Sequence, residues 1–215
     1  MREQTISHIL SKKLIAIVRK MPRAHIVGLG EALLAGGIEL MEVTFDPENP
    51  ADWRESCDSI RALRQHFGEA VRVGAGTVLD ARQVDMAHDA GALYIVSPNA
   101  DARVIEHTRA RGLVSLPGCM TPGEMVAAHE AGADFIKVFP VGVLGAAYIK
   151  AIRAPLSHLR LLAVGGVNEK NATGFLEAGC CGLGVGGGLV DKKLVMAGMF
   201  QNITALAAAY VELVG

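Results

Sequence analysis

Residues 113–139, LVSLPGCMTPGEMVAAHEAGADFIKVF, contain one complete strand–helix–strand pattern. Residues 113–116 and 135–139 are short apolar runs rich in branched side chains, which are typical of buried strands. Between them, residues 121–124 (TPGE) supply a hydroxyl cap, a proline in the first turn and a glutamate three positions after the cap, which together begin a helix. Gly132 lies where that helix should end. The stretch therefore predicts a strand, a helix and a second strand.

The same pattern repeats along the whole chain. Eight apolar runs are strand candidates, at residues 14–18, 38–44, 71–73, 93–96, 113–116, 135–139, 161–164 and 183–185. Glycines mark the predicted helix ends, at Gly36, Gly68, Gly91, Gly112, Gly132 and Gly179. Their spacing gives a strand–helix unit of about 20 to 30 residues.

Parallel strands that alternate with helices bury both sheet faces either in an open, doubly wound sheet or in a closed barrel. Eight units match the barrel, so we predict a (β/α)8 TIM barrel with an additional N-terminal helix near residues 3–11. No linker is visible, so residues 1–215 are predicted to form a single domain. The alternative, an open flavodoxin-like sheet, leaves several units without a place, and no G-x-G-x-x-G follows the first strand.

Composition excludes several classes of protein. The chain of 215 residues is 51% hydrophobic, which is too apolar for a disordered protein. Its 21 basic and 22 acidic residues are scattered, so we expect no nucleic-acid partner and no membrane anchor. The four cysteines show no C-x-x-C spacing and the N-terminus has no signal-peptide pattern, which favours a cytoplasmic protein.

Metal and acyl-transfer chemistry lack their usual sequence signals. The seven histidines never occur as H-x-H or H-E-x-x-H, so we predict no metal centre and no cofactor. No serine lies in a G-x-S-x-G motif, which argues against an acyl-transfer hydrolase.

Lys137 is the first catalytic candidate, because the active site of such a barrel lies at the C-terminal ends of its strands. It interrupts a run of large apolar residues, 135–139. Burial favours the neutral amine, which is the form that attacks a ketone to make a Schiff base. The alternatives are a phosphate ligand or a surface lysine whose stem packs against the apolar run.

Glu42 is the second catalytic candidate. Side chains alternate along a strand, so Glu42 should share the inward face of the second strand with Leu40 and Thr44. A carboxylate in this apolar setting suggests acid–base chemistry. The alternative is an exposed or structurally paired carboxylate.

Glycine clusters follow the last two strands, at residues 165–166 and 184–188. Exposed backbone N–H groups at these positions form the usual phosphate site of this architecture. Gly76, Thr77 and Pro98 end the third and fourth strands and are candidates for substrate positioning, with ordinary turn and cap roles as the alternative. Arg19 follows the first strand and is a candidate clamp for a carboxylate.

Five motifs occur in an order that identifies a family: EVT at 42–44, GAGTV at 74–78, IVSPN at 95–99, PGCMTP at 117–122 and IKVFP at 136–140. Across essentially the whole chain, the sequence resembles the bacterial KDPG/KHG aldolases. The resemblance implies a homotrimeric, metal-independent class I aldolase. It also implies that Lys137 forms the Schiff base with the keto acid and that Glu42 relays protons.

The resemblance also assigns substrate contacts. Arg19, Gly76, Thr77 and Pro98 correspond to positions that contact the pyruvate part of the substrate. Gly165, Gly166, Gly186 and Gly187 fall where the phosphate end is held. The implied reaction is cleavage of 2-keto-3-deoxy-6-phosphogluconate (KDPG) to pyruvate and glyceraldehyde 3-phosphate.

Two other classes of function stay open at this point. One is an aldolase for 4-hydroxy-2-oxoglutarate or 2-keto-3-deoxy-6-phosphogalactonate, which uses the same catalytic residues. The other is a catalytically silent phosphate-binding barrel. Three departures from the family pattern leave a non-phosphorylated substrate open: Asp46 replaces a cationic or hydroxyl residue after EVT, Val164 replaces a threonine and Gly187 replaces a serine.

Overall fold

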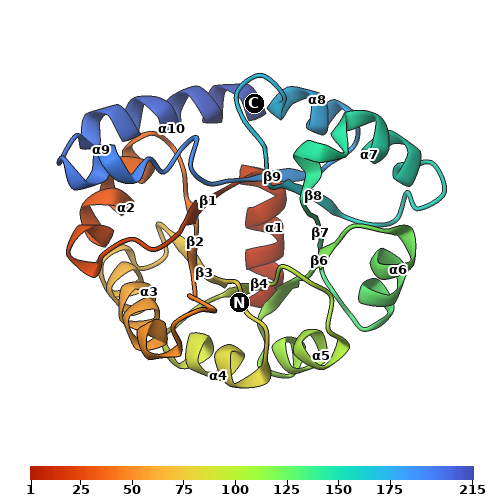
Figure 1. Cartoon of the computed structure of the whole chain (residues 1–215), viewed down its shortest axis with the longest axis horizontal. Coiled ribbons are helices and arrows are strands. Elements are labelled where there is room, and N and C mark those ends of the chain that lie inside the picture. Colours follow the sequence, from red (N-terminus) through yellow and green to blue (C-terminus); the bar gives the residue numbers. More distant parts are fainter.

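The strands form one parallel sheet that curves into a ring in the computed structural model, which describes residues 1–215 (Figure 1). The strands are β1 (Leu14–Val18), β2 (Leu40–Thr44), β3 (Arg72–Gly76), β4 (Tyr94–Val96), β5 (Val114–Leu116), β6 (Gly118–Cys119), β7 (Ile136–Val138), β8 (Leu161–Val164) and β9 (Gly182–Val185). Their order in the sheet is β5-β4-β3-β2-β1-β9-β8-β7-β6, and all neighbouring strands in this order pair in parallel. Each strand thus lies beside its neighbours in the sequence, as a barrel requires.

The ring closes beside the predicted fifth strand, residues 113–116, which forms β5 and is followed after Pro117 by a further short strand, β6. Pro117 separates the two segments, because proline has no N–H to donate to a strand ladder. The carbonyl of Ser115 accepts hydrogen bonds from Asp134 and Phe135, at 3.0 and 3.2 Å, and that of Pro117 accepts one from Lys137 at 2.9 Å. The prediction of eight strands is therefore wrong by one, because β6 forms a ninth strand after the break at Pro117. The predicted barrel is confirmed, and the open flavodoxin-like sheet is excluded.

Helices follow the strands around the outside of the ring (Figure 1). They are α2 (Ile26–Ala35), α3 (Trp53–Phe67), α4 (Ala81–Asp89), α5 (Ala102–Ala110), α6 (Pro122–Glu130), α7 (Gly145–Arg153), α8 (Ala172–Glu177), α9 (Lys192–Met196) and α10 (Phe200–Val214). A further helix, α1 (Arg2–Lys12), precedes β1 and lies apart from this outer layer (Figure 1). Short 3-10 turns are η1 (Arg23–His25), η2 (Pro50–Asp52) and η3 (Val141–Val143). None of these helices has the length and apolar character needed to span a membrane.

Side-chain alternation along the strands produces two separate hydrophobic cores. Met41 and Val43 of β2 face outward and belong to the larger core, beneath the surrounding helices. Leu40 of the same strand faces inward and packs with Tyr94 and Leu162 in a smaller core inside the barrel. Glu42 therefore shares the inward face with Leu40, as predicted.

Helix α1 closes one end of the barrel and confirms the predicted N-terminal helix (Figure 1). Its Ile6 and Ile9 are buried in the inner core, where each contributes roughly 1.5–3 kcal/mol. An ion pair between Arg2 and Asp134 anchors the start of the helix. Because α1 fills this end, ligands can reach the barrel interior only from the other end, where the strands terminate.

Candidate active site

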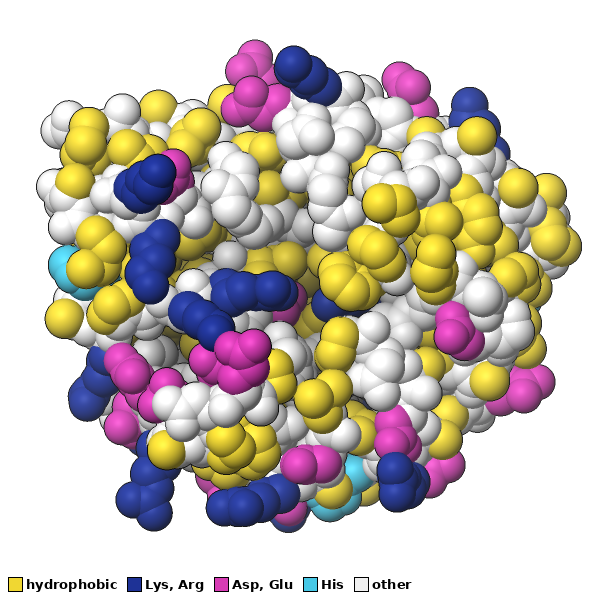
Figure 2. All heavy atoms as spheres, in the orientation of Figure 1, with side chains coloured by type: hydrophobic (Ala, Val, Ile, Leu, Met, Phe, Trp, Pro, Cys, Tyr) yellow, Lys and Arg dark blue, Asp and Glu magenta, His cyan; other side chains and the backbone are white.

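A cavity of about 650 Å³ lies among the C-terminal ends of β1, β2, β7, β8 and β9. Figure 2 shows this face of the molecule, with Lys and Arg side chains gathered beside a central hollow. The cavity brings together two sets of residues that the sequence analysis singled out. They are Lys137, Glu42 and Arg19, from β7, β2 and the end of β1, and Gly165, Gly166, Gly186 and Gly187, which follow β8 and β9.

Lys137 lies in the middle of β7 and is only 6% exposed. Its Nζ is 4.7 Å from the centre of the Phe139 ring, two residues further along the same face. Burial lowers the pKa of the Lys137 ammonium, Glu42 opposes this effect, and the positive charge of Arg19 adds to it. The structure thus excludes the surface-lysine alternative and favours a neutral amine inside the cavity.

Glu42 lies in β2, with Ile17 of β1 and Gly74 of β3 beside it in the sheet. Its side chain is 3% exposed, and burial raises the pKa of its carboxyl against the opposing charges of Lys137 and Arg19. These charges act on Glu42 through space, with no hydrogen bond to it. The buried site excludes the exposed alternative and places a proton-carrying group opposite an amine in one cavity.

Gly76 makes room for the Glu42 carboxylate. A Cβ atom at position 76 would lie 1.9 Å from Oε1 and 2.5 Å from Cδ of Glu42, far inside van der Waals contact. Gly76 therefore fixes where the carboxylate sits, although it does not line the main cavity itself. Gly76 is predicted from the sequence to contact the substrate, and the structure adds this steric role.

We expect Gly76→Ala to lower kcat for aldol cleavage by about 10²-fold, because it must displace a proton-transfer group by about 1 Å or more. Steady-state kinetics at saturating substrate measure the effect. Gly174→Ala is the matched control, since a Cβ there meets nothing within 4 Å and the residue lies in α8. A Gly76→Ala enzyme with wild-type kcat would show that the position of Glu42 does not limit the reaction.

Thr77 and Pro98 line a second cavity of about 390 Å³, which shares Arg19, Lys20 and Phe139 with the main one. The two cavities therefore meet at these three residues. Thr77 has φ of 57°, a left-handed conformation that is unusual for a branched residue and points to a position under constraint. Thr77 and Pro98 thus line the adjoining cavity and are absent from the lining of the main one, and their contact with pyruvate stays a prediction.

The glycines that follow β8 and β9 present free backbone donors to the cavity. The N–H groups of Gly165, Gly166, Gly186 and Gly187 donate to no backbone carbonyl. Gly165 and Gly166 have φ of 84° and 86°, and a Cβ at Gly165 would lie 2.8 Å from the Phe139 ring. Only glycine fits this turn, which leaves its donors open to an anion.

Sequence reasoning missed two cations that line the cavity, Lys20 and Lys192. Lys192 is the first residue of α9, four positions after the last glycine cluster, and it forms no ion pair within the chain. The sequence did contain a signal for Lys192, because a basic residue so close to a predicted anion-binding glycine cluster is a candidate ligand. Lys192 adds a cation to the cavity that Val164 and Gly187 also line.

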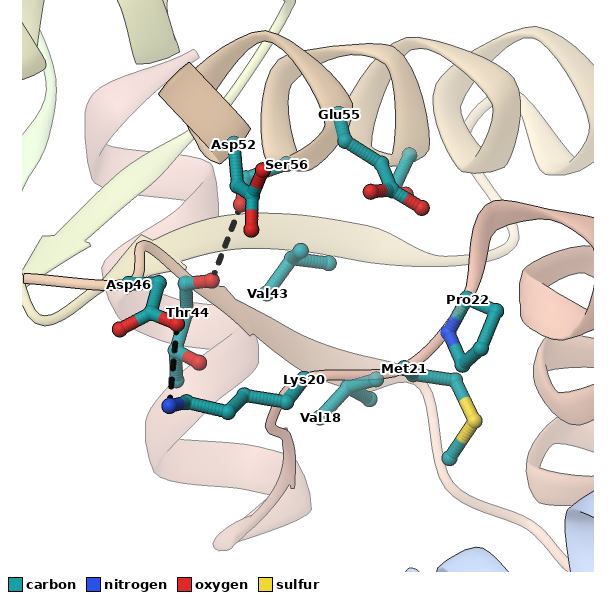
Figure 3. A pocket seen from close by; sticks show the side chains of 11 residues that line it. Val18, Lys20, Met21, Pro22, Val43, Thr44, Asp46, Asp52, Glu55 and Ser56 are labelled. Atoms are coloured by element: carbon teal, nitrogen blue, oxygen red, sulfur yellow. Dashed lines mark hydrogen bonds and ion pairs between the residues drawn. The ribbon is translucent and has the colours of Figure 1, made fainter. Parts of the chain in front are cut away.

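Lys20 is already neutralised by the residues that follow β2. Figure 3 shows its side chain reaching Asp46 beside a small neighbouring cavity of about 190 Å³. The Nζ of Lys20 is 3.0 Å from Asp46 and 3.4 Å from Glu48, and the hydrogen bond from Lys20 lowers the pKa of Asp46. Asp46 lines that neighbouring cavity and is absent from the main one, so its negative charge is paired and does not face the glycine clusters.

Comparisons with known proteins agree with this geometry. The model of the family "KDPG and KHG aldolase" matches residues 6–206. The chain is 36% identical over 202 residues to the 2-dehydro-3-deoxy-6-phosphogalactonate aldolase of Escherichia coli (strain K12), covering 94% of this chain and 96% of that protein. It is 34% identical over 193 residues to the 2-dehydro-3-deoxy-phosphogluconate aldolase of Treponema pallidum (strain Nichols), covering 88% and 87%.

A solved structure shows the same architecture. The chain superposes on a structure described as "Native KDPGal structure" with a TM-score of 0.83, at 35% sequence identity and with 94% of this chain and 93% of that chain covered. The predicted resemblance is therefore confirmed. The chain belongs to the KDPG and KHG aldolase family, whose members are carbon–carbon lyases.

Proposed function

We propose that the protein is a Schiff-base aldolase that cleaves a 2-keto-3-deoxy-6-phospho sugar acid to pyruvate and glyceraldehyde 3-phosphate. The observation that carries the proposal is the buried amine of Lys137 facing the buried carboxyl of Glu42 in one cavity of an aldolase barrel. Burial supplies the chemistry that each group needs. It favours the neutral nucleophile at Lys137 and a proton-carrying carboxyl at Glu42.

The first step joins enzyme and substrate. The neutral Nζ of Lys137 attacks the C2 carbonyl, and loss of water from the resulting carbinolamine gives a protonated imine. Arg19 lines this cavity, Thr77 and Pro98 line the adjoining one, and all three are positioned to hold the C1 carboxylate and the carbonyl. The positive charge of Arg19 suits the carboxylate and also favours the neutral form of the amine.

The second step breaks the C3–C4 bond. Glu42 removes the proton of the C4 hydroxyl, directly or through water, the C3–C4 electron pair moves into the imine, and the aldehyde leaves. The enamine that remains is protonated at C3 by the same carboxyl. Water then hydrolyses the imine, which releases pyruvate and restores the Lys137 amine.

The phosphate end of the substrate is assigned to the glycine side of the cavity. Free N–H groups at Gly165, Gly166, Gly186 and Gly187 provide donors without a permanent charge. Lys192 adds a charge at the same end. The two relatives named for galactonate and gluconate substrates match at 36% and 34% identity, so both C4 epimers are candidates.

A substrate panel tests this assignment. We expect kcat/KM for pyruvate release to be at least about 10²-fold higher for the two 6-phospho acids than for their non-phosphorylated forms and for 4-hydroxy-2-oxoglutarate, because buried donors left unpaired cost binding energy. A preference for non-phosphorylated acids would overturn the phosphate assignment. Release of no pyruvate from any compound would support the catalytically silent barrel.

The same substrate panel, measured with Lys192→Ala, tests how much the charge of Lys192 contributes to binding of the phosphate. We expect KM for the phosphorylated substrates to rise about tenfold, since a charge-assisted contact contributes about 1.5–3 kcal/mol when desolvated and less at this exposed site. Kinetics with non-phosphorylated acids should not change. Lys193→Ala, the next residue in α9 and absent from the cavity lining, is the matched control.

A further inference from the structure

Tyr94 has a buried hydroxyl group that the proposed reaction does not yet use. It lies in β4, is 0% exposed and belongs to the core inside the barrel. Its hydroxyl has no hydrogen-bond partner in the structure. Buried tyrosine hydroxyls normally find a partner, so this one requires an explanation.

The backbone of β3 lets Tyr94 and Glu42 approach each other. β3 lies between β2, which carries Glu42, and β4, which carries Tyr94. The residues of β3 that pair with Glu42 and Thr44 are Gly74 and Gly76, so β3 places no side chain between Glu42 and Tyr94 at this level of the barrel. A Cβ at Gly74 would lie 2.2 Å from the Tyr94 ring, and one at Gly76 would lie 1.9 Å from Glu42 Oε1. The ring and the carboxylate therefore lean over the same strand from opposite sides.

The groups around Glu42 determine what a hydrogen bond from Tyr94 would do to its carboxyl. Lys137 and Arg19 face Glu42 from β7 and from the end of β1, and Tyr94 faces it from β4. Burial raises the pKa of Tyr94, the negative charge of Glu42 raises it further, and the backbone N–H of Gly74 opposes both effects. The phenol therefore stays protonated at neutral pH and can act only as a neutral donor toward the carboxylate.

We propose that Tyr94 is a positioning residue whose hydroxyl donates a hydrogen bond to the Glu42 carboxylate through one water and holds it toward the C4 hydroxyl of the substrate. This inference rests on the proposed function and deepens it. Unlike Lys137 and Arg19, Tyr94 brings no charge that would compete for the carboxylate of the substrate. Its donor stabilises the ionised form of Glu42, which is the form that removes the proton.

Tyr94→Phe tests the proposal because it removes only the hydroxyl. We expect kcat to fall about tenfold while KM stays within about twofold, because a positioned proton transfer is affected and substrate binding is not. The acidic limb of the kcat profile should move to higher pH by about half a unit or more, since Glu42 loses a donor to its ionised form. Wild-type kcat together with an unshifted profile would overturn the proposal and leave Tyr94 as packing alone.

Thr108→Val is the matched control. Thr108 is equally buried and its hydroxyl also lacks a partner, but it lies in α5 within the outer layer. We expect this change to leave kcat and the pH profile unaltered. A shift of the profile in both variants would show a general effect of removing buried hydroxyls and would overturn a specific role for Tyr94.

A second measurement does not depend on turnover. In the folded chain with 13C-labelled glutamate, the carboxyl signal that is absent from Glu42→Gln reports the titration of Glu42. We expect this titration to occur at higher pH in Tyr94→Phe than in the wild-type chain, and an unchanged titration would contradict the proposal. Trapping of pyruvate with borohydride on Lys137 tests the proposed function separately, so a failure of either one is distinguishable from a failure of the other.

Discussion

Lys137→Met is expected to lower kcat/KM for aldol cleavage by about 10⁵-fold or more, because methionine has no amine to form the imine. Incubation with pyruvate and borohydride should give a covalent adduct on Lys137 of the wild-type chain and none on the variant. Mass spectrometry of the digested protein locates the adduct. Lys150→Met, exposed on α7, is the control and should keep both the activity and the adduct.

The same substitution should stabilise the fold. Since the pKa of the buried ammonium is lowered in the folded chain, the unfolded chain binds more protons between that lowered value and the ordinary 10.5. Burial of the Lys137 ammonium therefore lowers the free energy of unfolding of the wild-type chain by its full amount below this pH range. The free energy of unfolding then rises as the pH rises through the range. Lys137→Met removes the penalty, and we expect the free energy of unfolding at pH 7 to increase by about 1 kcal/mol or more.

Two results would contradict the role of Lys137. An adduct that persists in Lys137→Met would mean that another amine in the cavity, at Lys20 or Lys192, is the nucleophile. Turnover that stays within tenfold of the wild type would exclude imine chemistry at this residue. Denaturant unfolding shows in both cases that the variant is folded.

Glu42→Gln has the second largest expected effect, a fall in kcat of about 10³-fold, because the amide keeps the shape of the side chain and cannot transfer a proton. The variant should still accumulate the borohydride-trapped pyruvate adduct, since Lys137 is intact. Glu212→Gln, exposed on α10, is the control. A variant with kcat near the wild-type value would assign proton transfer to another group.

The pH dependence of stability gives an independent test of Glu42. Its folded pKa is raised above the ordinary 4.5, so the stability that the protonated form provides is complete below 4.5 and is lost as the pH rises through the folded pKa. We expect denaturant unfolding to show this loss in the wild-type chain and to show less of it in Glu42→Gln. The difference between the two chains should therefore grow with pH and then level off.

Much of the fold could be predicted because its signals are local. Apolar runs, glycine stops and helix caps recur in each unit, and Thr121 with Glu124 forms the capping box that the residues TPGE predict. The break at Pro117 was missed because the run 113–116 looked complete by itself. Whether the chain continues as a strand after the proline depends on its pairing with β7, which no local pattern contains.

The catalytic pair could be predicted for a different reason. Alternation along a strand decides which side chains face inward, and charged residues on an inward face are rare enough to stand out, as Glu42 and Lys137 do. The roles of these two residues in catalysis stay predictions, as do the substrate contacts, the homotrimer and the cytoplasmic location. The predicted family and its barrel are confirmed.

The sequence by itself determined the repeating unit, the barrel and the two buried charges, because periodicity and burial act over a few neighbouring residues. Three features depend on the folded chain: Lys20 pairs with Asp46, Lys192 reaches the cavity, and Tyr94 and Glu42 lie over Gly74 and Gly76 of the same strand. These contacts join residues that are distant in the chain. Their distances are set by the closure of the barrel and the register of its strands, and both are properties of the whole sheet.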